Sequence, residues 1–179
     1  MQQNNDLTSF CIVILVCLIK GKNMKGFNFT IQNFGYEKWL YIGERIIATN
    51  RINCFYIAPS ENSDFKFDVY FNTSLSFRPS PLGWETESKE EIESAFKKLC
   101  KEIIKLEPQF KVYNQRCINF ANICEIETLK QLDKPRIRLK FGIGEVEFGN
   151  TTNQEIYRIK NDFKHYCLDN QIKFNETNL

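Results

Sequence analysis

The sequence DFKFDVYF, residues 64–71, shows the clearest structural pattern in the chain. Phenylalanine or valine stands at every second position, and charged residues or tyrosine stand between them. Such period-two alternation predicts a β-strand with one face buried in a hydrophobic core. Leu75 and Phe77 continue the apolar parity beyond a stretch rich in threonine and serine. We therefore expect the remaining elements to cover or extend this strand.

Shorter β-patterns precede this strand. Alternating apolar residues predict a strand at 27–31, and apolar runs predict further strands at 39–42, 45–49 and 52–58. Gly43 and Glu44 fit a bend between two of them. The links between these strands are short, so the first half is expected to form an antiparallel meander.

Two helices are predicted by their capping residues and apolar stripes. Ser88 and Glu91 form a capping box before a stripe that ends at Pro108. Thr152 and Glu155 form a second capping box before the last helix. Each helix has one apolar stripe, which means one buried face, and the Phe face of strand 64–71 is the natural partner of the first helix.

The region between the helices is predicted to be mainly β. Residues 109–120 alternate in a second β region, and the spacing of Ile126, Leu129 and Leu132 suggests a short helix. Residues 136–148 fit a hairpin whose two-residue turn, Gly142–Ile143, matches the type II′ preference for glycine first. The register then pairs apolar with apolar residues and opposite charges with each other. The four pairs are Lys140 with Glu145, Leu139 with Val146, Arg138 with Glu147 and Ile137 with Phe148.

These patterns predict an α+β fold: a curved, mainly antiparallel sheet of about six to eight strands with two main helices packed on one face. Residues 24–179 are expected to form a single domain, because 179 residues suit one core. The sequence shows no internal repeat and no domain boundary.

Residues 1–23 form a separate question. The apolar run from Phe10 to Ile19 is about half the roughly 20 residues that a membrane-spanning helix needs, and no basic residue precedes it as a signal peptide would require. Residues 20–24 can be encoded as AAA GGA AAA AAT ATG, which resembles a bacterial ribosome-binding site before a start codon. We therefore hypothesise that Met24 is the true start. The alternative is a short apolar segment that anchors the protein to a membrane.

Composition limits the classes of function. The net charge is +2, which gives no global attraction to nucleic acid or to an anionic membrane. The seven cysteines are odd in number and lack Cys-x-x-Cys spacing, so they predict neither a disulfide framework nor a zinc site. A reducing, cytoplasmic location fits them best.

No catalytic constellation is visible. His165 is the only histidine, and it is expected on the solvent side of the last helix, which excludes a multi-histidine metal site. We expect no cofactor, since the chain has no Walker A loop and no nucleophile elbow. Asp64 and Asp68 could hold a metal ion only if brought together. A strand separates them by about 13 Å, so a solvated charged face is the preferred interpretation.

A basic stripe of Arg136, Arg138 and Lys140 could bind nucleic acid, but the hairpin register places Glu145 and Glu147 across from two of its members. Lys111 and Arg116 could add a basic-aromatic patch. A nucleic-acid binder or a carboxylate-dependent nuclease is therefore kept as an alternative.

The stretch RPSPLGW, residues 78–84, combines a rigid proline-rich backbone with arginine and tryptophan, which are favoured anchors at protein interfaces. The structural alternative is that Leu82 and Trp84 fold back onto the core. We expect a small intracellular protein-binding module of the inhibitor, immunity or adaptor type, and not an enzyme. Its candidate contact residues are Arg78, Leu82, Trp84, Lys111 and Arg116.

Overall fold

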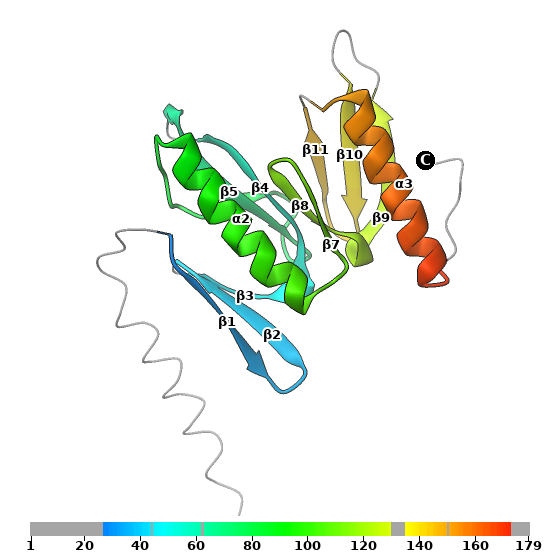
Figure 1. The fold of residues 1–179 in the computed structure, drawn as a ribbon, viewed down its shortest axis with the longest axis horizontal. Coiled ribbons are helices and arrows are strands. Elements are labelled where there is room, and N and C mark those ends of the chain that lie inside the picture. Colours follow the sequence, from blue (N-terminus) through cyan, green and yellow to red (C-terminus); the bar gives the residue numbers. More distant parts are fainter. Residues whose placement is uncertain (1–26, 44, 62, 130–134, 150, 173–179) are drawn as a thin grey trace, which may run out of the picture.

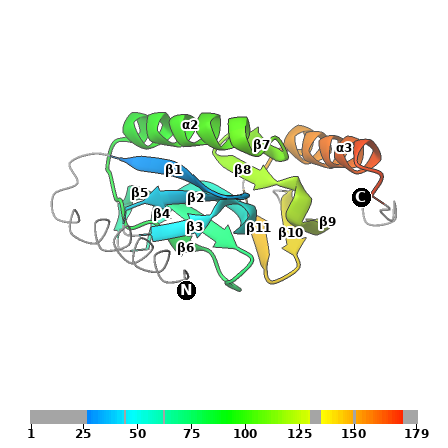
Figure 2. The ribbon, with the colours of Figure 1, turned by 90° about the horizontal axis from the view of Figure 1, so that it is seen from below.

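The structure is a computed structural model that describes residues 27–43, 45–61, 63–129, 135–149 and 151–172. This part of the chain is α+β, as predicted, with 11 strands in three antiparallel sheets and two α-helices. Figure 2 shows both helices on the same side of the strands. The expectations for residues 1–23 and for Met24 lie outside the described residues. No helix in the described ranges is long and apolar enough to cross a membrane.

The first sheet contains three strands in sequence order. They are β1 (Phe29–Phe34), β2 (Glu37–Ile42) and β3 (Arg45–Ala48). Gly35 and Gly43 occupy the two turns with φ of 61° and 58°, a left-handed conformation that favours glycine. This sheet ends at β3 because a 3₁₀ turn, η1 (Thr49–Arg51), redirects the chain.

The second sheet contains the strand that the sequence predicts at residues 64–71. Its order is β6-β5-β4-β8-β7. The bounds are β4 (Ile52–Ser60), β5 (Ser63–Thr73), β6 (Ser80–Pro81), β7 (Phe110–Tyr113) and β8 (Arg116–Asn119). The expected single meander is therefore divided between two sheets, since β3 does not pair with β4.

Helix α2 (Lys89–Leu106) covers the Phe face of β5, as predicted (Figure 1). The Ser88 hydroxyl accepts the Glu91 N–H at 3.1 Å, which caps the first turn. The helix and strands share one buried cluster of apolar side chains. Its main members are Leu40, Ile42, Ile52, Phe55, Val69, Phe71, Ile92, Phe96, Leu99, Ile103, Phe110 and Cys117.

The third sheet and the last helix follow. The sheet order is β11-β10-β9, and a 3₁₀ turn, η2 (Phe120–Asn122), leads into it. The bounds are β9 (Ile123–Leu129), β10 (Arg136–Phe141), β11 (Glu145–Phe148) and α3 (Asn153–Asp169). The Thr152 hydroxyl accepts the Glu155 N–H at 3.1 Å, which confirms Thr152 as the N-cap of this helix.

The hairpin of β10 and β11 has the register that the sequence predicts in all four pairs. Its turn differs in conformation, because the positive φ of 78° lies at Gly144 and not at Gly142. The short helix expected around Ile126 is wrong: this stretch belongs to β9. Alternation of Glu125, Ile126 and Glu127 across the sheet prevails over the helical spacing of the apolar residues.

The chain contains a structural repeat that its sequence does not reveal. Unit 1, residues 37–106, runs in the order hairpin β2–β3, turn η1, strands β4 to β6 and helix α2. Unit 2, residues 110–169, repeats that order with β7–β8, η2, β9 to β11 and α3. The two units lie side by side in Figure 1. The expectation of no internal repeat holds for the sequence and fails for the fold.

Local details support the repeat. Gly43 and Asn114 stand at the same place in the two hairpin turns, with φ of 58° and 48°. The pairing of β4 with β5 shifts by one residue just after Ile52, and the pairing of β9 with β10 shifts just after Ile123. Both helices start from a hydroxyl N-cap that accepts the N–H three residues further on. The units therefore match in backbone geometry as well as in element order.

Unit 2 has its own core, and strand β8 is shared between the two cores. The unit 2 cluster is made mainly of Phe120, Ile123, Ile126, Ile137, Leu139, Phe141, Val146, Phe148, Ile156, Ile159, Phe163 and Cys167. Cys117 on β8 faces the unit 1 cluster, and the next residue, Ile118, faces the unit 2 cluster. Because β8 pairs with β4, one continuous sheet joins the units.

Candidate binding surfaces

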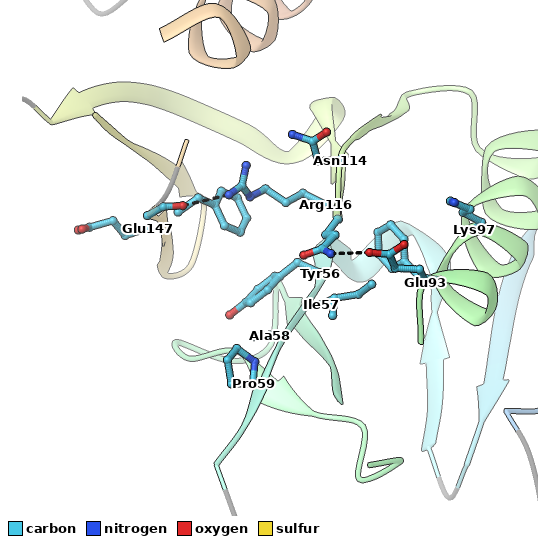
Figure 3. Close-up of a pocket in the computed structure, with 13 residues that line it drawn as sticks. Tyr56, Ile57, Ala58, Pro59, Glu93, Lys97, Asn114, Arg116 and Glu147 are labelled. Atoms are coloured by element: carbon cyan, nitrogen blue, oxygen red, sulfur yellow. Dashed lines mark hydrogen bonds between the residues drawn. The ribbon is translucent and has the colours of Figure 1, made fainter. Parts of the chain in front are cut away.

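A pocket of about 720 Å³ lies at the joint between the two units (Figure 3). The residues 56–59 of β4 line one wall, and Glu93 and Lys97 of α2 line another. The turn between β7 and β8, with the end of β11, completes it. The Gln115 amide donates to the Glu93 carboxylate at 3.0 Å across the joint. Part of the polar lining is therefore already used to connect the units.

Arg116 also lies at this joint, and its guanidinium contacts a carboxylate, a backbone carbonyl and an aromatic ring. It donates to the Glu155 carboxylate at 2.7 Å and to the Gly149 carbonyl at 3.0 Å. The same group lies 4.9 Å from the centre of the Phe148 ring. A half-buried arginine held by these contacts orients β8 relative to α3. The structure thus places this predicted contact residue inside unit 2 as a packing element.

The pocket offers little nucleophilic or acid–base chemistry. Burial raises the pKa of the Tyr56 hydroxyl, which stays neutral at physiological pH. Burial also raises the pKa of the Cys54 and Cys117 thiols, which disfavours the reactive thiolate. His165 is exposed on α3, as predicted, and does not line the pocket. Across the described ranges, no group of three or more His, Cys, Asp or Glu side chains could hold a metal ion.

The proline-rich stretch is attached to the core by an aspartate. The Asp68 carboxylate, on β5, is buried and accepts the Val69 N–H at 2.6 Å and the Gly83 N–H at 2.7 Å. Its expected position on a solvated strand face is wrong. Because β6 and the segment behind it cover the outer part of β5, this carboxylate serves as an acceptor for loop backbone. The side chain of Asp64 lies outside the described residues.

Leu82 and Trp84 consequently pack inward. Both are half-buried against the unit 1 core. The Trp84 ring lies 4.9 Å from the Phe27 ring, centre to centre. Of the two interpretations of this stretch, the structure favours the one in which it folds back onto the core. Arg78, at the start of the stretch, is exposed.

Two exposed apolar residues, Leu75 and Phe77, lie just before the proline-rich stretch, in the loop of residues 75–78. The Leu75 and Phe77 side chains are 76% and 78% exposed, so their strand parity does not carry them into the core. The loop backbone is held, because Ser74 N–H donates to Arg51 O at 2.8 Å. The Ser76 hydroxyl donates to Arg78 O at 2.7 Å. Sequence analysis missed this site, although the alternating serines and the following proline marked the end of the strand.

The 75–78 loop also touches unit 2. A side chain built on Gly144 would place its Cβ 2.9 Å from the Phe77 carbonyl oxygen. This close backbone contact brings Ile143, which is 42% exposed, beside the loop. Leu75, Phe77, Arg78 and Ile143 together are called the loop surface below. It combines three exposed apolar side chains with one cation on backbone that is tethered at both ends.

The basic residues named from the sequence do not form a free cationic face. Arg136 lies 2.9 Å from Glu147, and Arg138 lies 3.3 Å from Glu127. The Lys140 ammonium lies 2.6 Å from Glu127 and 3.1 Å from Glu125. These pairs neutralise the stripe. Of the two pairs that the register predicted across the hairpin, Arg138 does pair with Glu147, at 3.2 Å, whereas Lys140 is held by Glu125 and Glu127 of β9. Lys111 is exposed on β7, and the structure does not bring it together with Arg78, Leu82 or Trp84 on one strand or loop.

Comparison with known proteins adds no relative: no protein family matches the sequence, and no curated protein matches it significantly.

Proposed function

We propose that this protein binds another protein through the loop surface, and that it acts by binding and not by catalysis. The observation that carries the proposal is the exposure of Leu75 and Phe77, at 76% and 78%, on hydrogen-bonded backbone. Exposed apolar and aromatic side chains at one place are typical of protein interfaces. A loop that is already ordered loses less conformational entropy when a partner binds.

An intracellular, cytoplasmic role of the inhibitor, immunity or adaptor type is part of this proposal. The described cysteines support it, because all five carry free thiols and four of them are buried. Free thiols are typical of a reducing compartment. The ion pairs on β9, β10 and β11 favour a protein partner over nucleic acid, since each cation of the stripe Arg136, Arg138 and Lys140 is already paired with a carboxylate.

The proposal is tested with the full chain and two variants, both at exposed positions. Leu75→Ser with Phe77→Ser removes the apolar part of the loop surface, and Tyr36→Ser is the matched control at the fully exposed turn between β1 and β2. Partners are captured by cross-linking in the native cell, identified by mass spectrometry, purified and rebound. We expect the loop variant to weaken binding at least about tenfold, with the control unchanged.

Equal binding by the loop variant would overturn the proposal, and so would capture of nucleic acid alone. The second result would support the nucleic-acid alternative. Both substituted side chains are largely exposed, so the variant should keep the stability of the natural protein within about 0.5 kcal/mol. A change in binding is then a change in the surface and not in folding.

A further inference from the structure

The joint between the units is a template for an intermolecular contact. In it, β8 of unit 2 pairs antiparallel with the outer edge of β4 in unit 1. The pairs are Cys54 with Ile118, Phe55 with Cys117 and Tyr56 with Arg116. The hairpin turn continues the contact, since Ile57 N–H donates to Gln115 O at 3.0 Å. The joint thus requires a free strand edge on one unit and a free hairpin edge on the next.

Both kinds of edge recur at the two ends of the molecule. Strand β9 corresponds to β4, and in the described ranges it pairs only with β10. Strand β3 corresponds to β8, and within the same ranges it pairs only with β2. Figure 1 shows β3 and β9 on opposite sides of the molecule. A strand with an unpaired edge presents backbone donors and acceptors to any matching strand.

We propose that the protein associates with a second copy of itself, head to tail, by antiparallel pairing of β3 in one copy with β9 in the next. This inference goes beyond the proposed function and does not depend on it. Transfer of the joint register to these edges predicts three intermolecular pairs. They are Ile47 with Glu125, Ile46 with Ile126 and Arg45 with Glu127.

Near both unpaired strand edges, β3 and β9, apolar residues are exposed. The residues at the corresponding positions of the joint are covered. Cys117 is fully buried in the joint, and the residue at its position on β3, Ile46, is 49% exposed. Ile104, near the end of α2, packs against the unit 1 core beside β7. The residue at its position on α3, Leu168, is 57% exposed. Docking of a second copy would cover Ile46 and Leu168 in the same way.

The helix supplies one more exposed residue on the β9 side. Glu93 on α2 accepts a hydrogen bond from the hairpin turn of unit 2. The residue at its position on α3 is Tyr157, which is 73% exposed. An incoming hairpin turn from a second copy would lie beside this tyrosine. Of the eight large apolar residues found exposed in the described ranges, Ile46, Tyr157 and Leu168 are thus explained by one contact.

Charge is complementary across the proposed contact. The outer face of β9, β10 and β11 carries the carboxylates of Glu125, Glu127, Glu145 and Glu147. Their partners in ion pairs are Arg136, Arg138 and Lys140, so the face has one carboxylate in excess. The proposed register brings Arg45 to Glu127 on this face. A cation from the second copy would balance the excess carboxylate.

The two edges differ from each other, so the contact is heterologous and its products are chains or rings of copies. Its first consequence is a mass that rises with concentration in steps of the 21.2 kDa protomer. The measurement is analytical ultracentrifugation of the full chain. A protein that remains monomeric at about 100 μM would overturn the inference, because a contact weaker than that has no functional meaning at cellular concentrations.

A charge exchange tests the register. Arg45→Glu in one preparation and Glu127→Arg in another should each weaken self-association about tenfold, because like charges then face each other. An equimolar mixture of the two should recover it, since each variant supplies the edge that the other lacks. Lys101→Glu, on the exposed face of α2, is the charge control. Failure of the mixture to recover association would refute the register.

Apolar variants test the surface independently. Ile46→Asp and Leu168→Asp should each lower the association constant at least about tenfold. Leu75→Asp is the matched control, also at an exposed apolar residue but on the loop surface. This control should lose the protein partner and keep self-association, so the two proposals fail separately. Unchanged association in the Ile46 and Leu168 variants would overturn the inference.

Discussion

At the scale of single residues, Asp68 shows how a carboxylate can be structural without an ionic partner. It accepts backbone N–H groups, among them those of Val69 and Gly83, and so attaches the segment behind β6 to the central strand. Asp68→Ala should therefore destabilise the protein by about 1–3 kcal/mol, since a buried donor loses its acceptor. Urea denaturation measures this change. Asp169→Ala, at the exposed end of α3, is the control and should be nearly neutral.

The same carboxylate predicts a pH dependence. Burial raises the pKa of Asp68 in the folded state, and the hydrogen bonds from Gly83, Val69 and Trp84 only partly oppose it. The folded state then binds a proton more tightly than the unfolded state, so this group favours folding most below the unfolded pKa of about 3.9. Its contribution falls as pH rises through the folded pKa. The stability advantage of the natural protein over Asp68→Asn should shrink from acidic to neutral pH in denaturation experiments. A stability advantage that grows from acidic to neutral pH would contradict the predicted direction.

Gly144 is a second residue with a specific requirement. Its φ is 78°, and an added Cβ would lie 2.9 Å from the Phe77 carbonyl oxygen. Gly35 has a similar φ of 61° with no atom within 4 Å of an added Cβ. Gly35→Ala should cost about 1 kcal/mol for the left-handed backbone alone. Gly144→Ala should cost clearly more, because the contact between units must also shift. Equal costs by thermal denaturation would show that the loop moves freely.

At the scale of elements, the two helix caps have the same chemistry and predict the same loss. Ser88→Ala and Thr152→Ala each remove an oxygen that accepts an N–H at 3.1 Å. Each substitution should destabilise the protein by about 1 kcal/mol. Ser88→Asp and Thr152→Asp restore an acceptor and should recover most of the loss. The measurement is urea denaturation followed by far-ultraviolet circular dichroism.

Elements defined by local chemistry were predictable from the sequence. The two N-caps, the hairpin at 136–148 and the Phe face of β5 depend on residues close in sequence, and the structure confirms them. β9 was not predictable in this way, because the spacing of Ile126 and Leu129 fits a helix as well as a strand. Only pairing with β10, from residues further along the chain, decides between them.

The candidate site depended even more on distant contacts. Leu75 and Phe77 continue the core parity of β5, and the alternating serines with the following proline are a weak local sign that the strand has ended at Thr73. Asp68 lies on the polar parity, and only the segment around Gly83 buries it. Sequence patterns identify which residues share a strand face. They do not tell which later segment covers that face, and this decides between a surface and a core.

At the scale of the whole molecule, polar side chains at the joint connect the two cores. The polar contacts at the joint are buried: the Asn53 amide donates to Asn72 Oδ1 at 2.8 Å, and Asn119 Nδ2 donates to the Ile52 carbonyl at 3.0 Å. Asn122 Nδ2 reaches Asn53 Oδ1 at 3.1 Å. These side chains connect β4 and β5 of unit 1 with β8 and η2 of unit 2. Separation of the units would leave buried polar groups without partners, which favours cooperative unfolding.

Tryptophan fluorescence can report on this cooperativity. Both tryptophans, Trp39 and Trp84, lie in unit 1, so their fluorescence follows unit 1 alone. Phe163→Ala opens a cavity in the core of unit 2 and should cost about 3–5 kcal/mol. If the joint couples the units, the tryptophan transition shifts to lower urea together with the circular dichroism transition, although Phe163 itself lies in unit 2. The opposite outcome is a tryptophan transition that stays at the same urea concentration while the circular dichroism transition splits in two. That result would show that each unit folds alone, and strand β8 would then form a contact between two domains.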